Sequence, residues 1–185
     1  MIAPRILHLM RHGEPALAGR MLGHTDCDAT HAGIAACTAA AAGLSIGGIV
    51  TSDLRRAAAC AEAVAGPLPI HTDPRWRELD FGDWDGQAPA SLPPTALAHF
   101  WDDPDAYPPP QGERWSDLVA RIRPALADLP TDTLVVTHAG AIRAALAAAC
   151  GFDHRQVWAF DLPYAALLTL RIWPDATAQI SGLRT

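Results

Sequence analysis

The sequence contains no lysine and no asparagine, so all 14 basic residues of the 185-residue chain are arginines. Without lysine the chain cannot form a Schiff base, which excludes pyridoxal phosphate enzymes, and it lacks the P-loop lysine that holds a nucleotide phosphate. Without asparagine it has no N-glycosylation site. The chemistry of this chain must therefore rest on arginine, histidine and carboxylate side chains.

Long apolar runs, basic stretches and CxxC pairs are missing as well. The apolar runs are too short to span a bilayer, and the N-terminal segment turns polar too early for a signal peptide. The formal net charge is −6 with no basic stripe, which argues against nucleic acid and anionic membranes as partners. The cysteines are Cys27, Cys37, Cys60 and Cys150. Their spacing predicts buried reduced thiols, and we expect a cytoplasmic protein.

Short apolar runs alternate along the chain with alanine-rich segments. The runs predict strands at 5–10, 47–52, around 70, at 133–138, at 164–173 and at the edge position 176–183. Helices are expected at 31–42 with Thr30 as N-cap, from a cap at Ser52 or Asp53 to 65, at 95–101, at 116–129 with a kink or break at Pro124, and at 139–150. This order predicts an α/β fold, a three-layer sandwich with a mostly parallel central sheet flanked by helices. Residues 1–185 form one domain in this interpretation, with a proline-rich cap segment at about 86–112.

Two of the eight histidines follow predicted strands directly, namely His12 and His138. Ligands of such sheets bind at the carboxyl ends of the strands. Arg11 offers a fork of donors for phosphate oxygens, and a neutral imidazole beside it can attack phosphorus to form a phosphohistidine. His138 can bond a phosphoryl oxygen, and the helix start at Ala139 and Gly140 adds N–H donors. For His12 the alternative is an ordinary histidine in a turn, with Arg11 as a surface charge. For His138 the alternative is a histidine of the core.

Two arginines lie in the first turn of the helix that follows the second strand. A cation is unfavourable there for the helix dipole, which suggests a bound anion nearby. Solvation of both side chains is the alternative, and we favour it for Arg55. Arg56 points about 100° away, next to the small Ala57, and can face a pocket.

Glutamate is scarce, with only Glu14, Glu62, Glu78 and Glu113. Cleavage of a phosphate monoester needs an acid that protonates the departing alkoxide. Glu78 has apolar neighbours in the segment "WRELDFGDWDG" and is one candidate. The same segment holds Asp80, Asp83 and Asp85, and the physical argument alone does not choose among these carboxylates. An ordinary loop carboxylate paired with Arg75 or Arg77 is the alternative.

Five segments occur in the order "LMRHGEP", "SDLRRAAACAEAV", "RELDFGDWDG", "GERWSDLVARI" and "VVTHAGAIRA". In this order they resemble the histidine phosphatase (phosphoglycerate mutase-like) superfamily, over nearly the whole chain. The resemblance implies a phosphoglycerate mutase-like fold and His12 as the phosphorylated nucleophile. It implies Arg11, Arg56 and His138 as the phosphate pocket, with Arg56 chosen over Arg55 by the family register, and Glu78 as proton donor. It implies no metal and no other cofactor.

Within the superfamily, "FGDWDG", "PPPQGERW" and "GRMLGHTD" resemble the α-ribazole phosphatase branch, which acts in cobalamin synthesis. This resemblance implies α-ribazole 5′-phosphate as a candidate substrate and Arg20 as a substrate contact. The chain departs from the family pattern at "DCDAT", which lacks a Pro-Leu pair, at Asp53 and at Ala139. Specificity is expected in 86–112, where Trp101 and Tyr107 can stack on a leaving group, with a packed cap as the alternative.

Other functions stay open besides a phosphomonoesterase. A phosphoglycerate mutase is one, although such mutases are longer and use extra basic residues, and a broad-specificity sugar or nucleotide phosphatase is another. A non-catalytic phosphate-binding module would lack His12 or the acid. A metal hydrolase is disfavoured because no HExxH or HxH spacing exists and arginines adjoin both candidate histidines. The expected partner is a small phosphorylated metabolite, and both a monomer and a homodimer are compatible with the sequence.

Overall fold

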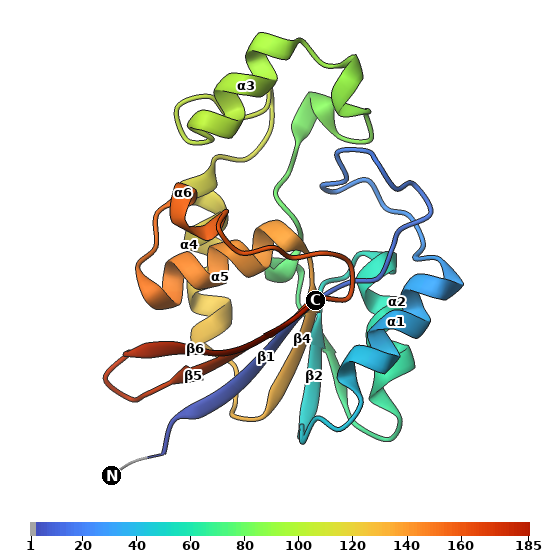
Figure 1. Ribbon diagram of the computed structural model, residues 1–185, viewed down its shortest axis with the longest axis vertical. Coiled ribbons are helices and arrows are strands. Elements are labelled where there is room, and N and C mark those ends of the chain that lie inside the picture. Colours follow the sequence, from blue (N-terminus) through green and yellow to red (C-terminus); the bar gives the residue numbers. More distant parts are fainter. Residues whose placement is uncertain (1–2) are drawn as a thin grey trace.

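The computed structural model describes residues 3–185 and shows an α/β sandwich built around one sheet (Figure 1). Its strands are β1 (Arg5–Arg11), β2 (Gly48–Thr51), β3 (Ile70–Thr72), β4 (Thr133–Thr137), β5 (Leu167–Ile172) and β6 (Ala178–Arg184). They lie in the order β3-β2-β4-β1-β5-β6. The first four strands in this order pair in parallel, and β5 and β6 are antiparallel to their neighbours. The predicted α/β fold with a mostly parallel sheet is confirmed.

The central strands are apolar on both faces because helices cover both sides of the sheet (Figure 1). Helices α1 (His31–Ala41) and α2 (Arg55–Ala65) pack on the face that carries Met10, Ile49 and Leu134. Helices α4 (Trp115–Ala127) and α5 (Ala139–Cys150) pack on the face that carries Leu9 and Val135. These are the three layers that the sequence predicted.

The ends of the helices follow the predictions in part. Thr30 caps α1, with its hydroxyl accepting from Gly33 N at 3.0 Å, and Gly151 ends α5 in a left-handed conformation with φ of 73°. The cap predicted for α2 is wrong. Its N-cap is Leu54, without a side-chain hydrogen bond, because the side chains of Ser52 and Asp53 bind partners elsewhere in the fold.

Helix α4 passes through Pro124 without a break and continues to Ala127. Pro124 lies on the exposed side of the helix, where water can bond the carbonyl that the proline leaves without a donor. One four-residue helix, α6 (His154–Val157), was not predicted, although Asp153 and Gln156 form a capping box around it.

The proline-rich segment rises beyond the carboxyl ends of the parallel strands (Figure 1). It contains α3 (Pro94–Asp102), close to the predicted helix 95–101, and short 3₁₀ turns at Gly82–Trp84 and Pro89–Ser91 flank its start. All four cysteines are free thiols, and three of them are buried. Within residues 3–185 no helix combines the length and the apolar character that a membrane crossing needs.

Candidate active site

His12 and His138 meet because they leave neighbouring parallel strands. Arg11 lies opposite Thr137 in the β1–β4 register, so the next residue of each strand faces the same point at the sheet edge. The two imidazole centroids are 5.0 Å apart. Both rings are buried, with 5% of His12 and none of His138 exposed. The structure thus brings together the two histidines that the strand ends pointed to.

The proton of the His12 ring is placed by its backbone contact. Nδ1 lies 2.7 Å from Gly13 O, and a carbonyl can only accept, so Nδ1 carries the hydrogen and Nε2 keeps a free lone pair. Burial lowers the pKa of His12 to about 3, with help from the charges of Arg56 and Arg11. His12 is therefore a neutral imidazole near pH 7, and its Nε2 can act as a nucleophile.

The loop after β1 needs glycine at position 13. A Cβ on Gly13 would lie 2.1 Å from Gly33 O, inside the start of α1. The Gly13 N–H donates to Cys60 Sγ of α2 at 3.3 Å, and His12 N–H donates to Thr137 O at 2.8 Å. Two helices and a neighbouring strand thus hold the backbone that carries His12.

Arg11 and Arg56 lie next to these histidines, Arg11 partly buried and Arg56 fully buried. The Arg11 guanidinium lies 4.1 Å above the Tyr164 ring and donates to Leu162 O, and burial lowers its pKa. Arg56 is fully buried, and burial lowers its pKa as well. Its guanidinium donates to the carbonyls of Leu22, Gly23 and Thr25.

Neither arginine has a carboxylate partner within the described residues. In both, the buried Nε also lacks a hydrogen-bond partner. Cations removed from water are normally paired, so two guanidinium groups without a carboxylate partner beside a neutral imidazole are suited to bind an anion. Arg55 differs as expected: 59% of its side chain is exposed, and it pairs with Asp26 and Asp28.

His138 is held by Ser52, whose Oγ lies 2.7 Å from Nε2. A hydroxyl that donates to Nε2 leaves the ring hydrogen on Nδ1, and Nδ1 is buried without a partner. Burial lowers the pKa of His138 well below its ordinary value, and Arg56, His12 and Arg11 act in the same direction. His138 is therefore neutral, and with the Ser52 hydroxyl as donor its buried Nδ1 carries an unused N–H.

Glu78 is not the ion-pair partner of its arginine neighbours, so that alternative is wrong. Arg75 pairs with Asp73 and Asp128, and Arg77 pairs with Asp53. The two Glu78 oxygens accept N–H donors instead, from Leu79 at 2.9 Å and from Gly140 at 3.0 Å. The second of these donors is in the first turn of α5, directly after His138.

The structure separates Glu78 from the other carboxylates of its loop. Glu78 lines a hollow of about 140 Å³ together with His12, and no aspartate does so. Asp85 accepts the backbone N–H groups of Gly23, His24 and Thr25, and Asp80 accepts that of Gly82. Asp83 is exposed. The hollow is lined by Arg11, His12, Pro15, Arg20, Met21, Leu22, Glu78, Phe81 and Tyr164.

The remaining predicted residues lie around this hollow. Arg20 is at its rim and donates to Gly86 O at 2.8 Å. Arg56 and His138 are fully buried and are not among its lining residues. Ala139 lines a neighbouring apolar hollow instead. Trp101 lines that neighbouring hollow too, whereas Tyr107 lies in a separate depression near His99.

Sequence reasoning missed the residue that holds the Glu78 loop. The Arg121 guanidinium donates to the carbonyls of Arg75, Arg77 and Glu78. It also forms an ion pair with Glu113, with Nε 2.7 Å from Oε1. The available signal was the segment "GERWSDLVARI", but no local pattern pairs a glutamate before a helix with an arginine two turns into it.

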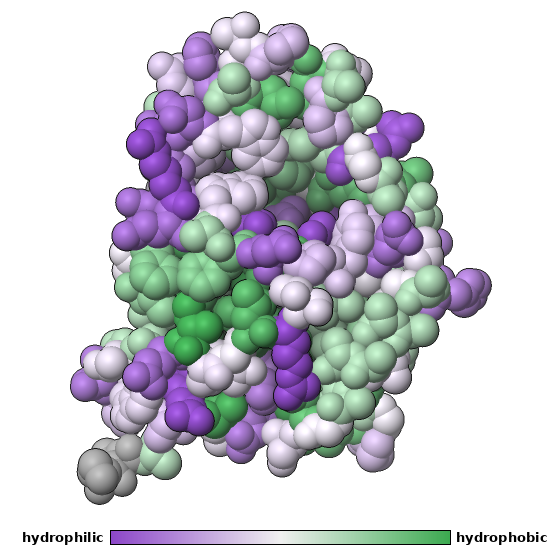
Figure 2. All heavy atoms as spheres, in the orientation of Figure 1, coloured by the Kyte–Doolittle hydropathy of each residue, from purple (hydrophilic) through white to green (hydrophobic). Residues whose placement is uncertain are grey.

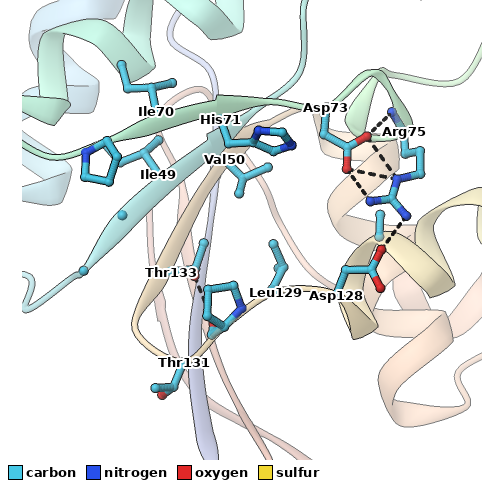
Figure 3. A pocket seen from close by; sticks show the side chains of 15 residues that line it. Ile49, Val50, Ile70, His71, Asp73, Arg75, Asp128, Leu129, Thr131 and Thr133 are labelled. Carbon is cyan, nitrogen blue, oxygen red and sulfur yellow. Dashed lines mark hydrogen bonds and ion pairs between the residues drawn. The ribbon is translucent and has the colours of Figure 1, made fainter.

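A further cavity of about 710 Å³ lies away from this site (Figure 3). It lies beside β2 and β3, and its lining includes neither His12 nor Glu78. The close view shows Arg75 bridging Asp73 and Asp128 at its rim, so its charges are paired (Figure 3). Within residues 3–185, no group of three or more histidine, cysteine or acidic side chains is placed to hold a metal ion.

Comparison with known proteins agrees with this geometry. Residues 7–181 match the family described as the histidine phosphatase superfamily (branch 1). The chain is 33% identical over 170 residues to glucosyl-3-phosphoglycerate phosphatase of Mycolicibacterium vanbaalenii, covering 80% of this chain and 75% of the relative. It is 30% identical over 198 residues to 2,3-bisphosphoglycerate-dependent phosphoglycerate mutase of Methylobacterium sp. strain 4-46, covering 95% of each.

Solved structures of known proteins have the same fold as this chain. The native structure of a mycobacterial glucosyl-3-phosphoglycerate phosphatase has a TM-score of 0.84 and 27% identity, covering 96% of this chain and 97% of that one. The α-ribazole phosphatase from Shigella flexneri has a TM-score of 0.84 and 24% identity, covering 97% and 96%. At that identity the second likeness bears on the fold alone. The expected phosphoglycerate mutase-like fold is confirmed.

Proposed function

The chain belongs to the histidine phosphatase superfamily (branch 1) as a phosphoric monoester hydrolase, and we propose that it cleaves a small phosphate ester through a phosphohistidine on His12. One observation carries the proposal. A buried neutral imidazole with a free Nε2 lies beside the partly buried Arg11 and the fully buried Arg56, and neither has a carboxylate partner within the described residues. Such a site binds a phosphoryl group and presents a nucleophile to it.

In the first step, Nε2 of His12 attacks phosphorus and the bond to the leaving alkoxide breaks. The guanidinium groups of Arg11 and Arg56 and the unused Nδ1–H of His138 stabilise the charge on the phosphoryl oxygens. The N–H of Ala139 at the start of α5 is a further proposed donor. Glu78 gives its proton to the departing alkoxide, because it lines the same hollow as His12.

In the second step, a water molecule attacks the phosphorus of the phosphohistidine. The Glu78 carboxylate takes a proton from this water, and the P–N bond breaks to release inorganic phosphate. His12 returns to its neutral form with the hydrogen still on Nδ1. The same carboxyl group thus serves as acid and then as base, so one turnover restores every group.

The substrate is proposed to be a phosphorylated metabolite, with α-ribazole 5′-phosphate as the candidate that the motifs at 81–86 and 108–115 favour. Arg20 at the rim of the hollow is proposed to contact the substrate. Residues 1–185 act as one domain in this proposal, with 86–112 as a cap over the site. Four free thiols are in keeping with a cytoplasmic enzyme.

Two relatives supply alternative substrates. A glucosyl-3-phosphoglycerate phosphatase is 33% identical to the chain, which favours a sugar phosphate as the second candidate. A phosphoglycerate mutase matches 95% of the chain, so transfer to a second hydroxyl is tested beside hydrolysis. Two assays decide among these candidates. Release of inorganic phosphate from each candidate substrate measures hydrolysis, and interconversion of phosphoglycerate isomers measures transfer to a second hydroxyl.

The mechanism is tested by trapping the intermediate. Wild-type protein mixed with a ³²P-labelled phosphoester and quenched should carry an acid-labile, base-stable label, and His12→Ala should carry none and lose turnover. His31→Ala is the control, because His31 is exposed on α1. Label or full turnover in His12→Ala would overturn the mechanism. Loss of wild-type activity in EDTA would point to a metal, and phosphate binding without any turnover would point to a non-catalytic module.

A further inference from the structure

A second hollow of about 110 Å³ adjoins the one that contains His12. Glu78 and Phe81 line both hollows, so the proposed acid is part of the wall that the two hollows share. A phosphate ester with its phosphorus at His12 and its leaving oxygen at Glu78 directs the rest of the leaving group toward this second space. The mechanism described above makes no use of it.

Aromatic side chains form much of the wall of this second hollow. Trp101 of α3 meets Trp158, which follows α6, edge to face at 5.1 Å. Phe100 lies 4.8 Å from Trp101 and 6.1 Å from Phe81, measured between ring centroids. Trp101 is 43% and Trp158 is 42% exposed, so both side chains of this wall are also open to solvent. The space-filling view shows that the molecule is hollowed below the proline-rich segment on this side, without separating the two hollows (Figure 2).

One buried cation lines the same space without a full set of partners. Arg143 of α5 is 9% exposed, and its guanidinium lies 4.0 Å above the Trp158 ring. Its Nη2 donates to Phe160 O at 3.2 Å, but its buried Nε has no hydrogen-bond partner. Within residues 3–185 no carboxylate forms an ion pair with it. A buried guanidinium in this state has donors to offer a ligand.

We propose that this second hollow is the leaving-group subsite and that the substrate is a phosphate monoester whose alcohol carries a flat aromatic ring with a hydrogen-bond acceptor. The ring contacts Phe81, Trp101 and Trp158, and the acceptor faces Arg143. This inference rests on the proposed phosphatase activity, because that activity places the ester bond at Glu78.

Size and polarity both favour such a ring. An apolar cavity of about 150 Å³ takes up a benzene molecule, and this hollow is comparable and open at one side. Offset-stacked and edge-to-face contacts with indole and phenyl groups stabilise an aromatic ligand beyond the area that it buries. A polyhydroxylated sugar would instead lose its bonds to water against Trp and Phe side chains that replace few of them.

The experiment compares esters of similar primary alcohols, so that the chemistry stays alike while the group in the subsite changes. We expect wild-type kcat/KM for 2-phenylethyl phosphate to exceed that for ethyl phosphate about tenfold or more. For 2-cyclohexylethyl phosphate, whose ring is not flat, kcat/KM should lie between these two values. The phosphate esters of 2-(3-carboxyphenyl)ethanol and 2-(4-carboxyphenyl)ethanol report on Arg143. At least one of them should have a higher kcat/KM than 2-phenylethyl phosphate.

Variants of the residues that line the second hollow test whether the aromatic ring of the substrate binds there. Trp101→Ala and Trp158→Ala should each lower the phenylethyl-to-ethyl ratio of kcat/KM about fivefold or more, mostly through KM. Arg143→Met should remove the advantage of the carboxylated ring, with circular dichroism to confirm folding. Tyr107→Ala is the matched control, because Tyr107 is 51% exposed and lines a different depression. It should leave the ratio unchanged.

The outcomes separate this inference from the proposed function. Equal wild-type kcat/KM for ethyl and 2-phenylethyl phosphate would overturn the aromatic subsite while leaving the phosphatase intact. A high ratio that survives both tryptophan variants would place the ring elsewhere and overturn the assignment to this hollow. Absence of turnover with every ester would overturn the proposed function itself.

Discussion

The carboxylate of Glu78 rests on the backbone of Gly140, with Oε2 3.0 Å from the glycine nitrogen. A Cβ added to Gly140 would lie 2.0 Å from Oε1 of the same carboxylate. Because Gly140 is the second residue of α5, the helix that follows His138 both bonds the proposed acid and leaves just enough space for it.

Gly140→Ala should separate stability from catalysis. Alanine is favoured over glycine in a helix by roughly 0.5–1 kcal/mol, so the free energy of unfolding should stay level or rise. The new methyl group must displace the Glu78 carboxylate, so we expect kcat on alkyl phosphates to fall about tenfold or more. Urea unfolding and steady-state kinetics measure the two effects.

Gly47→Ala is the control for adding a methyl group, since nothing lies within 4 Å of a Cβ at that position. It should leave kcat unchanged. A Gly140→Ala enzyme with wild-type kcat would show that the position of the Glu78 carboxylate does not limit the reaction.

Glu78→Gln should reduce activity according to the leaving group. A p-nitrophenolate departs without a proton, whereas an alkoxide needs one in the transition state, so the loss should be large on alkyl phosphates and small on p-nitrophenyl phosphate. Burst kinetics must show that phosphorylation of His12 limits the rate for each substrate. Asp83→Asn is the matched control from the same loop, because Asp83 is exposed. Leaving-group dependence in Asp83→Asn alone would mean that the acid is misassigned.

Two adjacent arginines should differ sharply on removal. Arg56→Ala deletes a fully buried cation of the proposed phosphate pocket, and we expect kcat/KM to fall about a hundredfold or more. Arg55→Ala removes an exposed side chain with two surface ion pairs, and its effect on stability should stay below about 1 kcal/mol. Kinetics and circular dichroism on both variants make the test. Equal losses of activity would contradict the assignment of Arg56.

The buried histidines should make stability fall on acidification. The pKa of His12 is about 3 in the folded chain and has an ordinary value of 6.5, so between these pH values the unfolded chain binds a proton that the folded chain lacks. The free energy of unfolding should therefore decrease by about 1.4 kcal/mol per pH unit for each such histidine as the pH falls through this window. His138 acts in the same direction.

His12→Gln should remove the contribution of one histidine to this slope. Urea unfolding of both proteins at pH 6, 5 and 4 gives the two slopes, and their difference cancels the titration of the carboxylates that they share. Parallel slopes would show that His12 is protonated alike in the folded and unfolded chains.

Much of the fold follows from local patterns in the sequence. Continuous apolar runs predict the buried strands β1 and β4, since helices on both faces leave no polar side to such a strand. Thr30 marked the start of α1 correctly, and the helix predicted at 139–150 ends where α5 does, because helix ends depend on a few neighbouring residues. The same apolar runs predict that His12 and His138 lie at the ends of strands.

Contacts between segments distant in the chain could not be predicted from local sequence patterns. Ser52 and Asp53 have the residue types of helix caps, but Ser52 bonds His138 and Asp53 pairs with Arg77. A side chain with two possible partners takes the one that the fold brings close, and local propensity does not describe the competition. The role of Arg121, which holds three carbonyls of the Glu78 loop from α4, escaped for the same reason.

The sequence by itself determined the positions of the strands and of most helices, and the residue types that reach the carboxyl edge of the sheet, because periodicity and capping act within a few residues. Only the tertiary structure decided which carboxylate faces His12, because four acidic side chains share one loop and only the fold turns Glu78 into the hollow. It also decided that Arg143 and Trp158 stack beside Trp101, residues far apart in the chain that meet only once α3, α5 and the segment after α6 have packed. Burial and charge at these meeting points depend on long-range packing, which no local pattern encodes.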